Sequence, residues 1–460
     1  DAAGRETARR IGEHLTLAQW WDPAGRLTGQ ALTAGPEAAT VQQRTYHYRP
    51  DGHLTAVDDL LSGHRAFDLD PAGRVTAVTA ADWSETYAYD AAGNQTSASW
   101  PAGHAAADAT GERTYTGTRL TRAGRFRYEY DAAGRTVLRQ RVRLSKKPDT
   151  WRYEWDAEDR LTTVTTPDGT RWRYLYDPLG RRIAKQRLAA DGETVTEQVD
   201  FTWDGPVLVE QTTTSPDLPH PVALTWDHDG HRPLAQTERL LDPADQSEID
   251  RRFFAIVTDL VGAPTELVDE TGEIAWHTRT TLWGTTWNRD ATAYTLLRFP
   301  GQYADPETGP LGLAPSPNPA TYVHNPSTWT DPLGLSPYHN QMPEDLAQEL
   351  ADAERLGVKP LRVGDDGFDA AVNSGTVKWA VDEQGDLFII PKHVDGTELK
   401  HPVLTEGRPV LAAGEAEIAG SSGSYFGMDI NNQSGHYKPS IESLETGRKA
   451  FERAGIQFFE

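Results

Sequence analysis

The sequence contains no cysteine among its 460 residues. This absence excludes disulfide bonds, thiol nucleophiles and zinc sites with cysteine ligands, including those of zinc-dependent deaminases. A run of about 18 apolar residues is also missing, so we expect no transmembrane helix and no insertion of this chain into a membrane. The first ten residues lack the charged and apolar regions of a signal peptide. They belong to a sequence repeat, which favours a chain that begins inside a longer protein.

Basic residues are fewer than acidic residues. The chain has 68 Asp and Glu against 45 Lys and Arg, a net charge of −23. Such a surface repels phosphate backbones and acidic membranes at long range, which excludes a general role in coating nucleic acids.

Turn-forming and aromatic residues are plentiful. The chain contains 40 Gly, 30 Pro, 16 Tyr and 14 Trp, whereas only 37% of its residues are hydrophobic. This composition favours many short strands joined by tight turns over one large helical core. The length predicts roughly two to four domains.

One pattern recurs along the first part of the chain: aromatic, any residue, aromatic, Asp, two residues, Gly, Arg and an aliphatic residue. The copies are WWDPAGRL (Trp20–Leu27), FDLDPAGRV (Phe67–Val75), YAYDAAGN from Tyr87, YEYDAAGRTV from Tyr128, YEWDAEDRL from Tyr153, YLYDPLGRRI from Tyr174 and a degenerate YRPDGHL from Tyr48. Six copies of one pattern exclude a chance set of Asp–Gly turns.

The residue types of this repeat explain its structure. Alternating aromatics such as Tyr128 and Tyr130 place two rings on one face of a strand. Asp can bond the backbone downstream of it, and Gly adopts the positive φ of a tight turn. The following Arg can pair with this Asp or stack on a neighbouring aromatic ring. Each unit is therefore a hairpin that must stack on its neighbours to bury its face.

These repeats resemble the YD repeats of the RHS family, whose sheets wind into a hollow shell around a toxin. Segments 259–276, 281–284 (TLWG) and 297–309 (LRFPGQYADPETG) resemble the RHS core-associated region, and NPSTWTDPLGL (Asn325–Leu335) resembles its terminal signature. The resemblance implies three parts: a mostly β shell segment over 1–296, a core-associated terminal region over 297–335, and a small α+β toxin domain over 336–460. A complete shell of this family is longer, so we expect an N-terminal part to precede this chain.

The resemblance also implies self-cleavage after the DPxGL signature by a pair of aspartates. Asp331 matches one of them, and the scissile bond is Leu335–Ser336. Two close carboxyl groups that share a proton suit this chemistry. The second aspartate normally lies in a tyrosine-rich stretch before an earlier P-x-G-L, but here GPLGL follows DPETG directly and that stretch is missing. Asp305 lies nearby but belongs to a different motif.

After Leu335 the repeat stops and an α+β pattern begins. Pro343–Leu356 predicts a helix. Strands are predicted over Thr376–Val381, Asp386–Pro391, Val410–Ala419, Ser424–Ile430 and Ile456–Phe459, with a helix after Pro439 that is capped by Ser440 and presents Ile441, Leu444 and Phe451 on one side. Within this region HExxH, HNH-like and DxD spacings are missing, so we expect no metal and no cofactor.

Two clusters in this region suggest acid–base chemistry. One is Lys392-His393 with Lys400-His401, and the other is Asn431–Pro439. Cleavage of RNA without a metal needs a base, an acid and a cation for the phosphate. We predict His401 and His436 as the acid–base pair, with Lys400 or Lys438 at the phosphate and Ser434 and Tyr437 orienting it. The arrangement resembles small RNase toxins of the barnase–EndoU–colicin–RelE type.

Other interpretations stay open. Asn-Asn-Gln-Ser-Gly is also a good turn sequence, and single histidines are common in sheets and on surfaces. An ADP-ribosyltransferase would use Glu415 or Glu417, although the usual order of motifs is not visible. A non-catalytic effector that binds a host protein is the third hypothesis. Residues 341–460 carry 21 Asp and Glu against 11 Lys and Arg, a net charge of −10, which suits a nuclease only if a local basic patch binds the RNA.

The family resemblance implies the remaining partners. They are a cognate immunity protein and a delivery apparatus, either secretion machinery of a contractile or type VI-like kind or a Tc-like complex. The toxin would be secreted and delivered into a target cell, where it meets RNA or a host protein.

Overall fold

The structure of the chain is a computed structural model. It describes residues 1–460 except 3, 92, 102–106, 118, 285, 289–290, 309–341, 343, 383–385, 409, 422, 438, 440–442 and 459–460, and except the side chains of 286–288 and 445. Contacts divide the chain into two compact units, Asp1–Gly334 and Leu335–Glu460.

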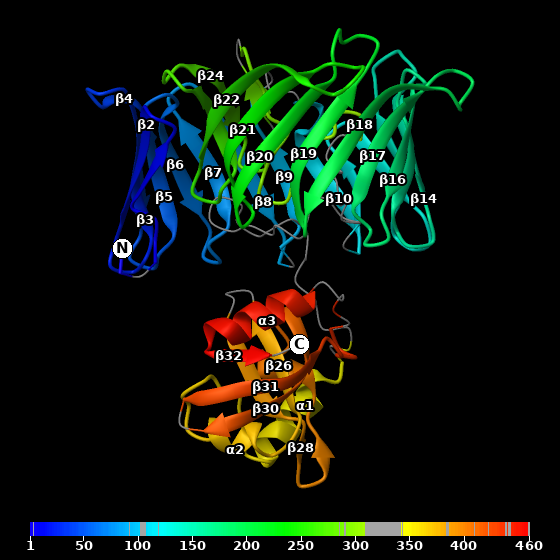
Figure 1. Ribbon diagram of the computed structural model, residues 1–460. Helices are drawn as coiled ribbons and strands as arrows, with labels where there is room; N and C mark the ends of the chain where they lie inside the picture. The colour runs from blue at the N-terminus through cyan, green and yellow to red at the C-terminus, as the bar shows by residue number, and fades with distance from the viewer. Residues whose placement is uncertain are drawn as a thin grey trace. The chain divides into compact units, whose positions relative to one another are not determined.

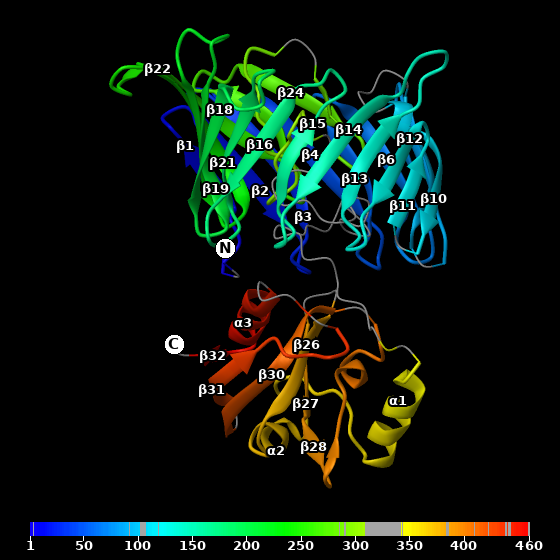
Figure 2. The ribbon, with the colours of Figure 1, turned by 90° about the vertical axis from the view of Figure 1, so that its right-hand side faces the viewer.

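Over its described residues the first unit forms one antiparallel sheet of 25 strands. Each strand pairs with the next one along the chain, without a crossover. Figure 1 and Figure 2 show the strands following one another along a curved wall.

The strands are β1 (Ala8–Ile11), β2 (Leu15–Trp21), β3 (Leu27–Ala34), β4 (Ala39–Tyr48), β5 (Leu54–Asp59), β6 (Gly63–Leu69), β7 (Val75–Ala80), β8 (Ser84–Tyr89), β9 (Gln95–Ser99), β10 (Gly111–Thr116), β11 (Arg119–Ala123), β12 (Phe126–Tyr130), β13 (Thr136–Arg141), β14 (Asp149–Trp155), β15 (Leu161–Thr165), β16 (Arg171–Tyr176), β17 (Arg182–Leu188), β18 (Val195–Asp204), β19 (Val207–Thr214), β20 (Val222–Asp229), β21 (Arg232–Leu241), β22 (Glu248–Thr258), β23 (Pro264–Asp269), β24 (Ile274–Thr280) and β25 (Thr286–Asn288), with a 3₁₀ turn η1 (Ala107–Ala109) before β10.

In each repeat the aspartate closes the predicted turn. The N–H of Gly134 donates to the carbonyl of Asp131 over 3.0 Å, and Gly134 adopts a φ of +90°. The Asp131 carboxylate accepts the N–H of Arg135 (2.9 Å) and its Nε (2.7 Å). The pairs that repeat this geometry are Asp22 and Arg26, Asp70 and Arg74, Asp156 and Arg160, and Asp177 and Arg181. The aspartate thus fixes both the turn and the direction of its arginine.

The same arginine also contacts the next repeat. The guanidinium of Arg26 lies 5.0 Å from the ring centroid of Tyr48, and that of Arg74 lies 4.9 Å from Tyr89. The hydroxyl of the stacked tyrosine donates back to the preceding repeat, as from Tyr48 to the Leu27 carbonyl over 2.7 Å. Both predicted roles of the arginine, pairing with Asp and stacking on a neighbouring ring, are confirmed.

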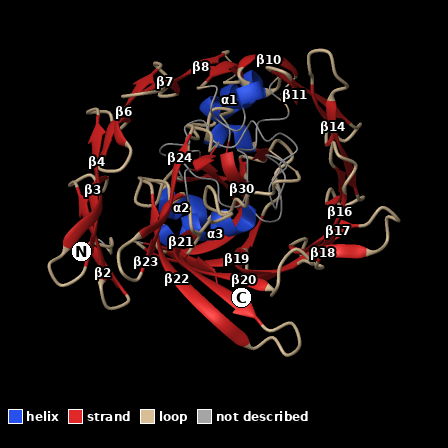
Figure 3. Ribbon diagram, turned by 90° about the horizontal axis from the view of Figure 1, so that it is seen from above, coloured by secondary structure: helices blue, strands red, loops and turns tan. Residues whose placement is uncertain are grey.

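The two ends of the sheet meet through its buried face. Leu15 and Leu32 of β2 and β3 pack with Val257 and Val268 of β22 and β23 in one apolar cluster. Gln30 Nε2 donates to the Thr258 carbonyl over 3.1 Å. In Figure 3 β23 and β24 lie inside the arc traced by β3, β4 and β6. The last strands of the sheet therefore line the face that the first strands bury.

A buried ionic cluster joins the segment after the sheet to its inner face. Asp305 pairs with Arg182 and, at 2.7 Å, with Lys185, and Lys185 lies 3.0 Å from Glu307. The side chains of Arg182 and Asp305 have no exposed surface. Burial alone would raise the pKa of Asp305, but Arg182 and Lys185 hold it below its ordinary value. Burial and the nearby Asp305 raise the pKa of Glu307.

The described residues of the second unit form a five-stranded sheet in the order β27-β26-β30-β31-β32, antiparallel except for the parallel pair β31–β32. Its elements are α1 (Leu346–Arg355), α2 (Phe368–Val372), β26 (Val377–Asp382), β27 (Leu387–Pro391), the hairpin β28 (His393–Val394) and β29 (Thr397–Glu398), η2 (His401–Leu404), β30 (Val410–Ser421), β31 (Ser424–Asn431), α3 (Ser443–Arg453) and β32 (Ile456–Phe458).

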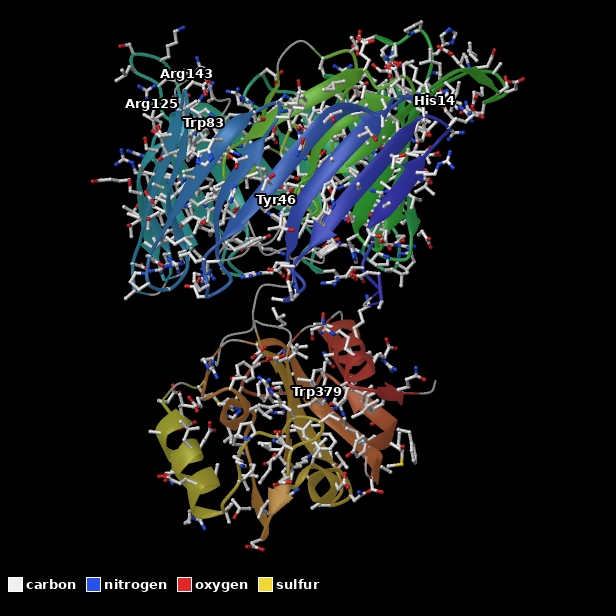
Figure 4. All side chains as sticks on the ribbon, turned by 90° about the vertical axis from the view of Figure 1, so that its left-hand side faces the viewer. His14, Tyr46, Trp83, Arg125, Arg143 and Trp379 are labelled. Carbon is white, nitrogen blue, oxygen red and sulfur yellow. The ribbon has the colours of Figure 1, made fainter. Side chains whose placement is uncertain are left out.

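Both faces of this sheet are covered. On one face Trp379 packs with Phe368, Ile418 and Phe451, and Figure 4 labels Trp379 in this unit. A second cluster covers the other face, formed by Ala353, Ala380, Ile390, Leu399, Val403, Leu404, Val410, Ala413 and Tyr437. Burial on both faces explains why β26 lacks the alternation of polar and apolar residues that marks a half-exposed strand.

The predicted fold class, a mostly β repeat shell followed by a small α+β part, is confirmed. Helix α1 begins three residues after the predicted Pro343, and α2 and η2 escape prediction because they span only five and four residues. Residues 440–442, which hold the predicted cap Ser440 and Ile441, lie outside the described residues. None of the described helices is both long and apolar enough to cross a membrane.

Asp305→Asn should destabilise the first unit by about 3–5 kcal/mol, because it removes the negative charge that faces buried Arg182 and Lys185. Urea unfolding followed by tryptophan fluorescence measures this, since Trp379 is the single tryptophan after Leu335. Because the folded-state pKa of Asp305 is depressed, its contribution is present at neutral pH and is lost as the pH falls through that value.

The matched control is Asp217→Asn, whose side chain is 80% exposed in its pair with Arg187. An unchanged urea midpoint for Asp305→Asn would show that the cluster does not stabilise the shell.

Candidate functional site

A row of polar side chains crosses the sheet of the second unit. Lys378 of β26 is directly opposite Glu415 of β30, which is directly opposite Asn431 of β31. Directly opposed residues share a face of a sheet. Strand alternation places this row on the same face as Ala380 and Ala413, beside the apolar cluster that contains Tyr437.

An ionic network surrounds this row. Glu398 accepts hydrogen bonds from Lys378 (2.8 Å) and Lys400 (2.7 Å), and Glu415 accepts one from Lys392 (2.8 Å). The bonds from Lys378 and Lys400 lower the pKa of Glu398 to about 2. Lys378 itself is only 4% exposed. A buried ammonium group paired with a carboxylate is thus built into the sheet.

His401 begins the turn η2 and is 2% exposed. Its Nε2 lies 2.9 Å from the carbonyl oxygen of Gly414. Since a carbonyl only accepts, Nε2 carries the proton and Nδ1 is left as an acceptor. Burial, followed by the charges of Lys378 and His436, lowers the pKa of His401 to about 3, although the Gly414 contact opposes this. His401 is therefore neutral at pH 7.

The close approach of strands at this point requires glycine. A Cβ on residue 414 would collide with the carbonyl oxygen of Asn431. Gly414 therefore lets β30 approach Asn431 while its own carbonyl binds His401.

His436 lies in the loop after β31 and is 8% exposed. Its Nε2 lies 2.7 Å from Oε1 of Glu349, a residue of α1 whose side chain is 12% exposed. The two atoms do not have hydrogen-bond geometry, and the contact is an ion pair only when the imidazole is protonated. The contact joins α1 to the loop that follows β31.

Ser434 and Tyr437 hold this loop in place. The N–H of Tyr437 donates to Oγ of Ser434 over 3.3 Å, and the Tyr437 hydroxyl donates to the Arg408 carbonyl (3.0 Å) and contacts Oγ1 of Thr405 (3.0 Å). Burial raises the pKa of Tyr437. Both side chains are used by the fold itself, and they lie on either side of His436 in this loop.

The structure brings some of the predicted site residues together. His401 and His436 are close enough for the charge of one to affect the other, and Lys400 joins the same network through Glu398. His393 is exposed on β28. Lys438, Asp331 and the Leu335–Ser336 bond lie outside the described residues.

The two glutamates considered for ADP-ribosyl transfer differ in their surroundings. Glu415 lies in the polar row and binds Lys392, whereas Glu417 is exposed.

The sequence interpretation missed Glu349, Lys378 and Glu398. Glu349 lies in the predicted helix, but nothing local distinguishes it from the other acids of that helix. Lys378 did carry a signal, because it is the charged residue inside the apolar run Val377–Val381. A lysine in a strand that is buried on both faces needs a partner.

The pKa of His401 can be tested directly. In a sample with ¹³C-labelled histidine, the His401 resonance should stay at its neutral position from pH 8 to pH 5, because this pKa is about 3. The resonance is identified by its loss in His401→Gln. A His401 signal that titrates between pH 6 and pH 7 would contradict the buried, neutral state.

The match to a known protein family lies within the first unit. The family model of the RHS repeat matches residues 70–105, 149–171 and 155–194, all within the first unit. The double-stranded DNA deaminase toxin A of Burkholderia cenocepacia is 33% identical over 383 residues, which cover 73% of this chain and 25% of that protein.

Two further relatives have similar coverage. The probable deoxyribonuclease RhsA of Dickeya dadantii is 29% identical over 73% of this chain and 24% of its own length. The toxin protein Tse5 of Pseudomonas aeruginosa is 29% identical over 72% of this chain and 30% of its own length. This chain thus spans about a quarter to a third of the length of these curated relatives.

Solved structures share the fold of the shell. The Photorhabdus luminescens Tc holotoxin pore with the TccC3-D651A mutation aligns with a TM-score of 0.57 at 18% identity, over 73% of this chain and 19% of that one. The crystal structure of TcdB2-TccC3-Cdc42 aligns with a TM-score of 0.55 at 17% identity, over 72% of this chain and 19% of that one. Together with the YD-type repeats, the family match and the 33% identical relative, these alignments show that the chain belongs to the RHS-repeat family.

Proposed function

We propose that this chain is the C-terminal part of an RHS toxin. In this proposal residues 1–296 are part of the delivery shell, residues 297–335 form its terminal region and residues 336–460 are the effector. The relatives support it, because they include a toxin named as a DNA deaminase and a probable deoxyribonuclease with similar coverage of this chain. Since similar relatives have different activities, the activity of this effector has to be argued from its own side chains.

We infer that the effector is a metal-independent ribonuclease. The observation that supports this most is the 2.7 Å contact between His436 Nε2 and Glu349 Oε1, beside His401 and the ammonium groups of Lys378 and Lys400. These residues combine an imidazole base, a carboxylate that stabilises its protonated form and cations for a phosphate.

The proposed reaction begins with His436. Its imidazole takes the proton of a ribose 2′-hydroxyl, the 2′-oxygen attacks the adjacent phosphorus, and Glu349 stabilises the imidazolium that forms. The bond to the 5′-oxygen breaks, which leaves a 2′,3′-cyclic phosphate and a 5′-hydroxyl. Lys400 and Lys438 neutralise the phosphate and protonate the leaving oxygen.

His401 has a different part in this scheme. It was predicted as one member of the acid–base pair with His436, but a pKa of about 3 leaves it uncharged at neutral pH, and its single N–H is donated to the Gly414 carbonyl, so it has no acidic proton for the leaving oxygen. We therefore propose that it positions the Gly414 carbonyl and the neighbouring Glu415, while His436 exchanges the proton.

His436→Ala should lower RNA cleavage by about 10²–10⁴-fold, because it removes the base. The measurement is cleavage of total RNA by the purified chain, with detection of 2′,3′-cyclic phosphate ends. The matched control is His393→Ala, since the His393 side chain is exposed on the β28–β29 hairpin. Equal cleavage by His436→Ala and the unaltered chain would exclude His436 as the base.

The same assay separates the other hypotheses. Intact RNA with consumption of NAD would favour the ADP-ribosyltransferase and Glu415. Damaged or deaminated DNA with intact RNA would favour the activities named for the relatives. Intact RNA, DNA and NAD would favour a binding effector that sequesters a host protein.

We further propose that the effector is released by cleavage of the Leu335–Ser336 bond with Asp331 as one of the catalytic carboxyl groups. Mass spectrometry of the purified chain should then find a fragment that begins at Ser336, and Asp331→Asn should abolish it. Asp217→Asn, a change at an exposed carboxylate of the shell, is the control. An intact chain in every sample would contradict release by this bond.

The proposal includes the partners expected of such a toxin. The effector would be secreted and delivered into a target cell by a contractile, type VI-like or Tc-like apparatus, and a cognate immunity protein would neutralise it in the producing cell. The fold shared with Tc-toxin components supports the delivery part of this proposal.

A further inference from the structure

A cavity lies on the inner face of the first unit and is not used by the proposed function. Strands β4 to β8 form one wall, and residues 259–265, 280–284 and 298–299 form the other. Within the cavity, the volume open to a water-sized sphere is about 70 Å³. Tyr46 and Trp83, which line it, are labelled in Figure 4.

Most of the lining is apolar and aromatic. Tyr46, Phe67, Trp83, Trp276 and Phe299 contribute five aromatic side chains, and aliphatic residues fill the spaces between them. Flat rings on several sides suit a ligand with a flat apolar body.

Several polar atoms of lining residues have no hydrogen-bond partner among the described residues. They are the donors Arg44 Nη1, Arg65 Nε and Trp276 Nε1 and the acceptor Glu85 Oε1. The residues Arg44, Glu85 and Trp276 are 3%, 1% and 2% exposed. Buried polar atoms without partners cost free energy, so the donor Arg65 Nε and the acceptor Glu85 Oε1 on one cavity point to a ligand that completes these two atoms.

The other atoms of these residues are already in use. Arg44 donates Nε to Asp59 (2.7 Å) and Nη2 to Glu266 (2.5 Å), which leaves Nη1 for the cavity. Glu85 receives the Tyr87 hydroxyl and the N–H of Leu282 (2.9 Å) on Oε2. Their side chains are therefore fixed in position, with one unsatisfied atom each.

Two of the guanidinium groups lack a carboxylate within ion-pair distance among the described residues. Arg65 is near enough for its charge to lower the pKa values of Asp59, Glu85 and Asp259 without pairing directly with them. Arg298 donates Nη1 to the carbonyls of Thr295 (2.9 Å) and Leu297 (2.8 Å). Burial lowers the pKa of Arg298 to about 10. A carboxylate in the cavity would give both guanidinium groups a direct, charged hydrogen-bond partner, beside the carboxyl groups of Glu85 and Asp259 that also line it.

We propose that this cavity binds a small aromatic carboxylate that also carries a hydroxyl group. The carboxylate would accept from Arg65 and Arg298, the ring would lie among Tyr46, Trp83 and Phe299, and the hydroxyl would donate to Glu85 Oε1. The site lies wholly in the first unit, so the test of ligand binding there does not depend on the ribonuclease proposal.

The test is calorimetric titration of the full chain with 4-hydroxybenzoate as the probe. We expect saturable 1:1 binding, weakened at least about tenfold in Arg65→Gln and in Arg298→Gln, because each change removes a charged hydrogen bond. Arg125→Gln, whose side chain is 60% exposed, is the matched control and should bind like the unaltered chain. Inorganic phosphate, which has no ring, should bind at least about tenfold more weakly than the probe.

Hydrogen exchange of the unaltered chain gives a second readout that no folding defect of a variant can affect. The probe should slow exchange in residues 259–265 and 280–284 and leave β16 and β17 unchanged. Lack of saturable heat up to about 10 mM probe, a concentration above ordinary metabolite affinities, would overturn the proposal. So would equal affinity for phosphate, or equal affinity of the two arginine variants and the control.

Discussion

The shell depends on the contact between the arginine of one repeat and the aromatic ring of the next. Asp131 shows how this works, because its carboxylate closes the turn and fixes Arg135 at once. In the pairs Arg26–Tyr48 and Arg74–Tyr89 the fixed arginine lies over the next ring, whose hydroxyl bonds back to the previous repeat. A single hairpin cannot bury its aromatic face, so this contact makes each repeat the support of its neighbour.

The sequence allowed this much of the fold to be predicted because the information is local. Within one copy of the pattern the aromatics, the turn and the arginine lie within nine residues, and the ring on which the arginine stacks belongs to the next copy, so pattern and stereochemistry suffice. The cluster of Asp305 with Arg182 and Lys185 could not be predicted in the same way, since its partners are 123 and 120 residues apart in the chain. Asp305 drew notice only as part of a motif, and its burial is decided by tertiary packing.

In the candidate site, too, the residues that lie close in the sequence were predicted, and those that meet only through packing were missed. The clusters around His401 and His436 were visible as short runs of polar residues. Glu349 and Lys378 were not, because α1 and β26 approach these runs only in the folded unit. The state of His401 was also beyond prediction, since its low pKa comes from burial and from charges on other elements. Residue type thus indicated the chemistry, and packing decided which histidine can carry it.

The meander of the first unit has a consequence for the order in which the shell forms. Each strand finds its partner among the residues just before it, so pairing can advance from the N-terminus as the chain is made. The contacts of Gln30 with Thr258 and of Arg44 with Glu266 span more than 200 residues, 228 and 222 by position. The inner face of β3 and β4 therefore stays exposed until β22 and β23 have been synthesised. A chain stopped before β23 would keep the pairing of β3 with β2 and β4 but leave their apolar inner face open to other molecules.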